Sequence, residues 1–251
     1  MRRMEYKIVG DVIQALQIEL KRGEEIYAEA GTMLYMGPGI DLQARMQGGL
    51  MKGLMRKFLA GESMFMSVFR CETATERMAL ANPIAGKIIP IQLNGNTILA
   101  ERNAYLCAIG NVDLSIAFTK RFGAGLFGGE GFILQKISGQ GLLFLHAGGN
   151  MLEFNLAPGE NLRVDTGCIV SFAESVSYDI QFVGGIRNAL FGGEGLFYAT
   201  LTGPGHVVLQ TLPFSRLANR IAAAVGSRKD ESKGLAGIAG GVLGNIISGD
   251  D

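Results

Sequence analysis

The chain has 251 residues with 23 basic and 23 acidic side chains, so its formal net charge is zero. A neutral protein has no global positive field to attract nucleic acid, and we therefore expect no RNA or DNA partner. Glycine makes up 37 residues, about twice the usual frequency, and it falls between apolar segments, as it does in the turns of an all-β protein.

The segment 5–46 is predicted to form the opening strands. Turn residues interrupt it at Arg22-Gly23, at Ala30-Gly31 and at 37–39, where proline stands between two glycines. Its last part, residues 40–46, alternates large apolar residues with mostly polar or small ones. That alternation is typical of a strand with one buried face.

The segment 48–62 has a different pattern, which predicts an amphipathic helix. Its apolar residues Leu50, Met51, Leu54, Met55, Phe58 and Leu59 recur at helical spacing, and Lys52, Arg56 and Lys57 lie off that stripe. One interpretation is an interfacial helix that enters lipid headgroups or a partner's groove. The other is a lid whose stripe closes the β body or an oligomer interface.

Strands are predicted to resume at 64–71 and again at 132–137 and 196–201. Each is followed by a second apolar run, of which 142–146 and 207–212 are the clearest. Glycine-rich turns are predicted between the runs at 138–141 and 202–205. Pro90, within 87–93, favours an edge strand or a bulge, because proline cannot donate to the ladder.

The β body is predicted to end near Pro213. Ser215 is a predicted N-cap for a helix over 216–225, which Gly226 ends. The tail 234–249 is apolar and rich in glycine. Small residues at fourfold spacing would suit helix packing in lipid, but glycine costs about 1 kcal/mol each in a helix, which favours a flexible tail.

Several of these segments are related by an internal repeat. Residues 126–131 (Leu-Phe-Gly-Gly-Glu-Gly) recur unchanged at 190–195, and a looser copy stands at 58–63. The alternating segments 40–46, 112–118 and 176–182 follow the same order. We therefore predict one β body, 1–213, built of three repeats at about 5–92, 93–155 and 156–213, followed by a helix and tail over 214–251.

The cysteines and histidines suggest no catalytic or metal site. Cys71, Cys107 and Cys168 are predicted to be buried hydrophobes inside strands, since their odd number and isolated spacing do not fit a disulfide framework or a zinc site. His146 and His206 are not repeat equivalents. We predict a non-enzymatic protein without cofactor or metal.

The residues that recur in the repeats are the candidates for function. Glu62, Glu130 and Glu194 follow each glycine-rich connection. They could form a carboxylate cluster around a central axis, or each could accept hydrogen bonds from the backbone of its own turn, which we favour. The predicted partner or membrane surface contains Leu50, Met51, Lys52, Leu54, Met55, Arg56, Lys57, Phe58, Arg121, Phe127, Arg187 and Phe191.

The segment 48–65, together with 190–196 and Thr202-Gly-Pro-Gly, resembles the "altered inheritance of mitochondria" family, over about residues 5–213. Members are bacterial proteins of unknown function with fungal mitochondrial relatives. The resemblance implies an all-β, double-stranded β-helix fold similar to the tryptophan-RNA-binding attenuator protein, and the mitochondrial members imply a part in inner-membrane organisation. The attenuator's tryptophan pocket and RNA-binding lysines have no matching motif here, and the family has no established catalytic residues.

We therefore expect an all-β, non-enzymatic scaffold or binding protein. It is expected to be cytoplasmic, because 1–10 contain no apolar leader and no run reaches the ~20 apolar residues of a spanning helix. It should form a homo-oligomer, a trimer being one form, and present its basic apolar connections to a membrane surface or a protein partner. The alternative is a small-ligand-binding or metabolic protein with a pocket within the β repeats.

Overall fold

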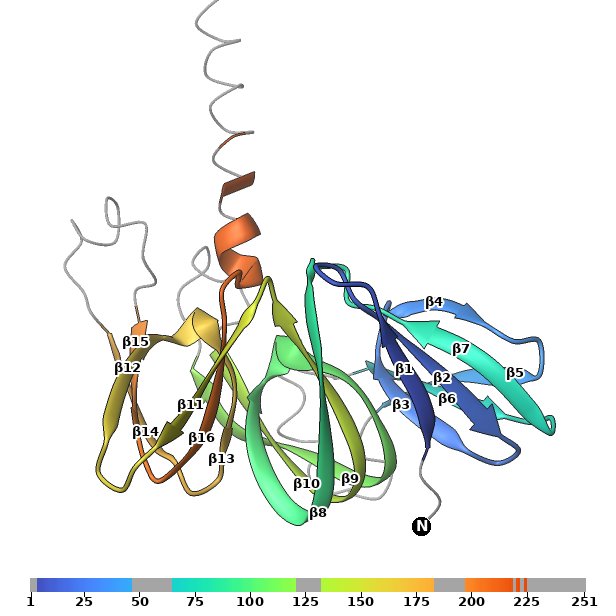
Figure 1. The fold of residues 1–251 in the computed structure, drawn as a ribbon, viewed down its shortest axis with the longest axis horizontal. Helices are drawn as coiled ribbons and strands as arrows, with labels where there is room; N and C mark the ends of the chain where they lie inside the picture. Colours follow the sequence, from blue (N-terminus) through green and yellow to red (C-terminus); the bar gives the residue numbers. More distant parts are fainter. Residues whose placement is uncertain are drawn as a thin grey trace, which may run out of the picture. The chain divides into compact units, whose positions relative to one another are not determined.

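A computed structural model describes residues 4–46, 65–120, 132–182, 197–218, 220, 221 and 224 (Figure 1). The chain divides into two compact units, Met1–Pro213 and Phe214–Asp251. The described elements of the first unit are strands and two short 3₁₀ turns, so the all-β expectation is confirmed, and every pairing between these strands is antiparallel. In the second unit residues 214–218, 220, 221 and 224 are helical. Ser215 therefore lies inside the helix, and its predicted role as N-cap is wrong.

The described elements are β1 (Glu5–Val9), β2 (Ala15–Lys21), β3 (Glu25–Glu29), β4 (Met33–Met36), β5 (Ile40–Met46), β6 (Phe65–Cys71), β7 (Thr75–Leu80), β8 (Gly86–Glu101), η1 (Arg102–Ala104), β9 (Tyr105–Lys120), β10 (Phe132–Gly148), β11 (Met151–Leu156), β12 (Asn161–Asp165), η2 (Thr166–Cys168), β13 (Ile169–Ala173), β14 (Ser177–Phe182), β15 (Phe197–Thr202) and β16 (Gly205–Gln210). They form three sheets. The orders are β1-β2-β7-β4, then β11-β16-β13-β8-β10-β9-β3-β6-β5, and β12-β15-β14.

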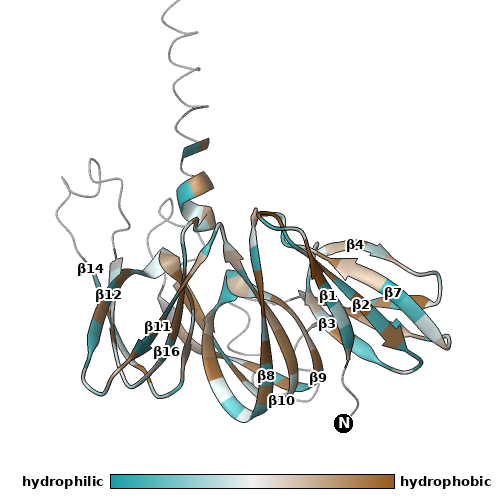
Figure 2. Cartoon of the chain, viewed as in Figure 1, coloured by the Kyte–Doolittle hydropathy of each residue, from teal (hydrophilic) through white to brown (hydrophobic). Residues whose placement is uncertain are grey.

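Alternating sequence explains which face of each strand is buried. In β2, Leu16, Ile18 and Leu20 point into the core and the residues between them are partly exposed. Apolar and polar residues alternate along the ribbons in the same way (Figure 2). Burying each such side chain contributes about 1.5–3 kcal/mol, which fixes the register, because a slip by one residue would expose the whole apolar set.

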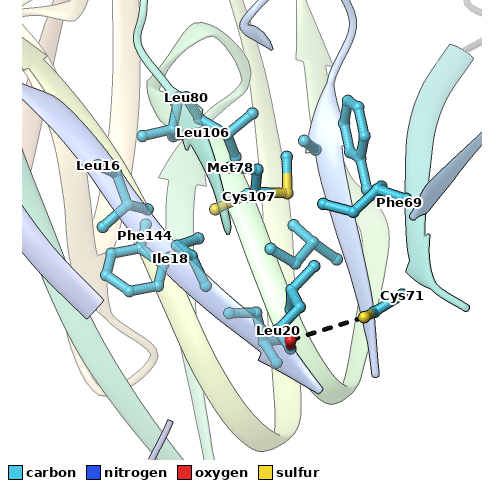
Figure 3. Packing of buried hydrophobic residues seen from close by; sticks show 14 of the residues in the cluster. Leu16, Ile18, Leu20, Phe69, Cys71, Met78, Leu80, Leu106, Cys107 and Phe144 are labelled. Atoms are coloured by element: carbon cyan, nitrogen blue, oxygen red, sulfur yellow. Dashed lines mark hydrogen bonds between the residues drawn. The ribbon is translucent and has the colours of Figure 1, made fainter. Parts of the chain in front are cut away.

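Two of the hydrophobic cores lie between sheets. In the first, Leu16, Leu20 and Met78 of the four-stranded sheet pack against Phe69 and Phe144 of the nine-stranded sheet (Figure 3). The Cys71 thiol at its edge lies 3.6 Å from the carbonyl oxygen of Leu20 and donates to it. In the second, the three-stranded sheet packs against β13 and β16.

Strand pairing recurs at fixed offsets along the chain. The central strands β6, β10 and β15 each hold two neighbours in the same register. The corresponding triples are Glu25–Arg70–Asp41, Thr97–Ser138–Asp113 and Asn161–Thr202–Ser177. A bulge also recurs at the corresponding residues Leu34, Leu106 and Val170, where the pairing skips one residue. We call the groups of strands around β6, β10 and β15 the first, second and third strand sets.

The caps of the two 3₁₀ turns are also related by an offset seen in the strand pairing. The carboxylate of Glu101 accepts a hydrogen bond from the backbone N–H of Asn103 at 2.9 Å, which caps η1. Asp165, 64 residues later, accepts from the N–H of Gly167 at 2.8 Å and caps η2. In both 3₁₀ turns a carboxylate at the N-terminal end accepts a hydrogen bond from a backbone N–H that has no acceptor within the turn.

Three local expectations can be compared with the structure. The turn predicted at 138–141 is wrong: β10 continues through it with a bulge between Ser138 and Gln140, because β8 and β9 pair with it on both sides. Cys168 ends η2 instead of lying in a strand, and it is only partly buried. Pro90 lies where the described part of β8 pairs only with β10, so its position is a local edge, as expected.

Candidate functional site

The predicted surface lies outside the described residues. Every member from Leu50 to Phe191, and all three glutamates, Glu62, Glu130 and Glu194, belong to the segments 47–64, 121–131 and 183–196. We call these segments the three connections. The structure describes the strands that carry them.

Each connection joins the two strands of an antiparallel pair. The last paired residues are Met46 with Phe65 for β5 and β6, Lys120 with Phe132 for β9 and β10, and Phe182 with Phe197 for β14 and β15. These pairs stand at the corresponding end of each strand set. The connections with their basic and bulky apolar residues are therefore attached to equivalent positions of the β unit.

Strand β4 is an exposed apolar surface that the sequence analysis did not single out. Its side chains keep large exposed fractions: Met33 40 %, Leu34 57 %, Tyr35 45 % and Met36 37 %. The corresponding strands are buried: Tyr105–Ala108 is at most 1 % exposed and Ile169–Phe172 at most 4 %. This run of exposed apolar side chains is a candidate interaction surface, because the counterparts of the strand are covered.

The sequence contains a signal for this surface. Four apolar residues in succession, Met33 to Met36, lack the alternation of a strand with one solvent face. Such a run is typical of a strand covered on both faces. The run by itself does not identify a surface, because an apolar run of this kind is ordinarily a core strand.

A shallow groove of about 500 Å³ runs beside β4 and is lined by Glu19, Tyr35, Met36, Gly37, Thr75, Glu76 and Arg77. Its charged groups already have partners. Arg77 pairs with Glu19 at 3.2 Å, and Glu76 accepts from the Gly39 N–H at 3.1 Å and from the Thr73 hydroxyl at 2.9 Å. The Tyr35 ring and the Met36 side chain therefore supply its apolar contact surface.

A second groove, of about 430 Å³, lies on the three-stranded sheet and is mostly polar. Its lining is Asn161, Arg163, Ser177, Tyr178, Asp179, Gln181, Thr200 and Thr202. Thr202 donates to Asn161 at 2.6 Å and Gln181 donates to Asp179 at 2.6 Å. Hydroxyl, amide and charged groups around one tyrosine can bind a polar small molecule by hydrogen bonds.

The titratable groups with displaced pKa values are explained by packing and by ion pairs. Burial raises the pKa of Tyr105 well above its ordinary value, raises the pKa of the Cys107 thiol and lowers the pKa of His146 to about 4. Hydrogen bonding to Lys87 lowers the pKa of Asp11, and hydrogen bonding to Lys136 lowers that of Glu174. Each shift therefore has a local structural cause, either burial or a surface ion pair, and needs no catalytic role to explain it.

In the part of the chain that the structure describes, no group of three His, Cys, Asp or Glu side chains is placed to hold a metal ion. Among the same residues, no helix combines the length and the apolar composition that crossing a bilayer requires. The exposed His206 makes a surface pair with Glu153, with 3.0 Å between Nε2 and the carboxylate.

Comparison with known proteins identifies a family and related chains. A family model described as "Mitochondrial biogenesis AIM24" matches residues 6–212. An uncharacterised protein of Streptococcus pyogenes serotype M6 is 25 % identical over 213 residues, which cover 82 % of this chain and 84 % of the relative. A crystal structure of a Streptococcus pyogenes protein superposes with a TM-score of 0.71 at 23 % identity, and the match covers 88 % of this chain and 100 % of the other. That similarity shows a shared fold.

Proposed function

Because the chain belongs to the mitochondrial biogenesis AIM24 family, we propose that it is a non-enzymatic scaffold that works peripherally at an anionic membrane surface. The scaffold is the β unit, and the contact surface is formed by the three connections. In this proposal the protein is cytoplasmic and homo-oligomeric. Several copies then present many connections at once.

The observation that carries the proposal is the equivalent attachment of the three connections. The residue pairs Met46–Phe65, Lys120–Phe132 and Phe182–Phe197 hold them at corresponding ends of the strand sets. Each connection contains a basic residue and bulky apolar residues in the same order. Apolar side chains that enter the headgroup region and basic side chains that meet anionic lipid reinforce each other, at about 1 kcal/mol per basic residue near the surface.

Co-flotation with vesicles of phosphatidylcholine and phosphatidylserine tests the proposal. The wild type should float, and its binding should fall as salt is raised, because basic residues contribute through screened attraction. A double variant, Leu54→Glu with Phe58→Glu, should stay at the bottom of the gradient. Leu152→Glu is the matched control, since Leu152 is a half-exposed leucine on β11 and does not belong to a connection.

Equal flotation of the wild type and the double variant would refute the membrane proposal. Flotation of neither protein would do the same. Binding of a protein partner is then the remaining interpretation of the three connections.

We further propose that the three strand sets are a tandem repeat with an attenuator-protein-like arrangement. The repeated registers, bulges and caps support this proposal. The three glutamates then have equivalent places, and each accepts hydrogen bonds from its own glycine-rich turn.

A second candidate function is the binding of a polar small ligand, and the groove on the three-stranded sheet favours it. Thr200 stands at its centre, between Arg163 on β12 and Asp179 on β14. A screen of sugars and polar metabolites by thermal shift would test this function. The melting shift should be confined to one compound class and should be lost in Thr200→Val, which removes a hydroxyl at constant shape.

A further inference from the structure

Two sheet junctions inside the chain are built in the same way. The first strand set joins the second through β3 and β9, with Ile26 opposite Ile109, Tyr27 opposite Ala108 and Ala28 opposite Cys107. The second set joins the third through β8 and β13, with Ile98 opposite Ala173, Leu99 opposite Phe172 and Ala100 opposite Ser171. Adding 72 to each residue number on β3 and 64 to each residue number on β9 gives the residue pairs of the second junction.

Continuing this rule beyond the third set identifies the strands of a third junction. The strand that corresponds to β3 and to residues 97–101 of β8 is β12, and the strand that corresponds to the start of β9 and to β13 is β4. β12 pairs only with β15, and β4 pairs only with β7, in the part of the chain that the structure describes. Each of them is the last strand of its sheet.

β5, β11 and β14 also end a sheet, but at least one counterpart of each has a single neighbour as well. β5 and β14 have one neighbour each, and the corresponding part of β9 pairs only with β10 among the described residues. β11 pairs only with β16, and the corresponding first half of β8 pairs only with β10. Among the described strands, only β4 and β12 have one neighbour fewer than both of their counterparts.

The exposure of the two edges agrees with a missing neighbour. All four side chains of β4 are exposed, whereas the counterparts on β9 and β13 are buried. On β12, Arg163 is exposed, whereas its counterpart Leu99 is buried and Tyr27 is half-buried. An exposed apolar edge strand with unused backbone donors and acceptors is a template for pairing with another chain.

The bulge in β4 does not prevent such pairing. Bulges often protect sheet edges, but Leu106 and Val170 occupy the corresponding bulged positions and their strands are still paired on both sides. The charges do not oppose such pairing, because Arg163 of β12 would meet a groove that carries two carboxylates, Glu19 and Glu76, and one cation, Arg77, which already pairs with Glu19.

We propose that β4 of one copy pairs antiparallel with β12 of a second copy, in the register of the two internal junctions. The register places Leu162 opposite Gly37, Arg163 opposite Met36 and Val164 opposite Tyr35. The contact is heterologous, because two different edges meet, so copies assemble head to tail into a ring or a filament. This inference deepens the homo-oligomeric part of the proposed function and does not depend on membrane binding.

A pair of opposite charges at one position tests the register. Met36→Lys places an ammonium opposite Arg163 and should dissociate the assembly to the chain mass of 26.8 kDa in light scattering. Met36→Glu places a charge at the same exposed position but opposite a cation, and it should keep the wild-type mass. Met36→Lys combined with Arg163→Glu should restore it, and unchanged melting of Met36→Glu shows that a charge at this position does not unfold the strand.

Cysteine cross-linking gives a second measurement, in a Cys168→Ser background that removes the partly exposed native thiol. Met36→Cys with Arg163→Cys should form disulfide-linked multimers on a non-reducing gel, since directly opposed residues have Cβ atoms about 5 Å apart. Met36→Cys with Asp165→Cys, shifted by two residues on the same face, should cross-link far less.

Four results would overturn the inference. They are a wild type that is monomeric at micromolar concentration, equal masses for Met36→Lys and Met36→Glu, cross-linking of Met36→Cys by itself, and a cysteine pair that closes within one chain. Substitutions at Leu54 and Phe58 should not change the mass, so the failure of the membrane proposal and the failure of this one are separate outcomes.

Discussion

The Tyr105 hydroxyl donates a hydrogen bond to the backbone carbonyl of Tyr27 at 2.7 Å. The two residues lie 78 positions apart in the sequence and belong to the first and second strand sets, at the junction of β3 and β9. Tyr105 is fully buried, and burial raises its pKa well above the ordinary value, so the hydroxyl remains a donor throughout the physiological range.

Tyr105→Phe should therefore destabilise the protein by about 1 kcal/mol, since it removes one buried hydrogen bond and keeps the ring packing. The measurement is the midpoint of urea unfolding, and the control is Tyr198→Phe, because Tyr198 is 37 % exposed. The control should change the free energy of unfolding by less than about 0.5 kcal/mol. An equal effect of the two substitutions would show that the bond across the junction does not contribute.

Gly139 forms the bulge that keeps β10 continuous. Its φ is +122°, and an added Cβ would overlap the carbonyl oxygen of Asn111 on β9. Gly95 also has a positive φ, +90°, but open space around the Cβ position. Gly95→Ala should cost about 1 kcal/mol from backbone conformation alone, and Gly139→Ala should cost clearly more, because the overlap adds to it. Equal losses in chemical unfolding would contradict the role of close approach at this bulge.

His146 should make stability fall in mild acid. Burial lowers its pKa from the ordinary 6.5 to about 4, although a hydrogen bond with the backbone of Ile84 offsets part of that shift. Between these two values the unfolded chain binds a proton that the folded protein does not. The contribution is fully present above pH 6.5 and is lost as pH falls toward 4, with a maximum of about 3 kcal/mol.

The test compares the pH dependence of urea unfolding in the wild type and in His146→Gln. The carboxylates contribute equally to both proteins, so the difference between the two slopes isolates this histidine. Between pH 6.5 and 4 the wild type should lose stability more steeply. Parallel curves, or an NMR titration of the His146 ring near pH 6.5, would show that burial does not control it.

Local sequence patterns predicted most of the strands because a buried face leaves a period of two in the sequence. The alternation in 40–46 and 176–182 corresponds to β5 and β14, and the glycine breaks at Arg22-Gly23 and Gly37 correspond to the ends of β2 and β4. The pattern failed at 138–141. There the glycines that predict a turn allow a bulge instead, because strands on both sides continue the ladder.

The predicted partner or membrane surface illustrates a different limit of prediction from sequence. Its residues recur in glycine-rich connections, and the structure describes the strand ends that carry them. The sequence does not point to β4, because Met33 to Met36 have the pattern of an ordinary core strand. An apolar run shows that a strand needs cover on both faces and does not show whether the chain itself supplies it.

The amino-acid sequence by itself determined the all-β class, the strand periodicity and the recurring order of segments, since these depend on side-chain alternation and on residues that tolerate positive φ. Only the tertiary structure decided which strands are neighbours. Backbone hydrogen bonds are the same for every residue type, so pairing partners are selected by packing between distant segments. Among the described strands, that selection leaves β4 and β12 each with one partner fewer than the strands to which they correspond.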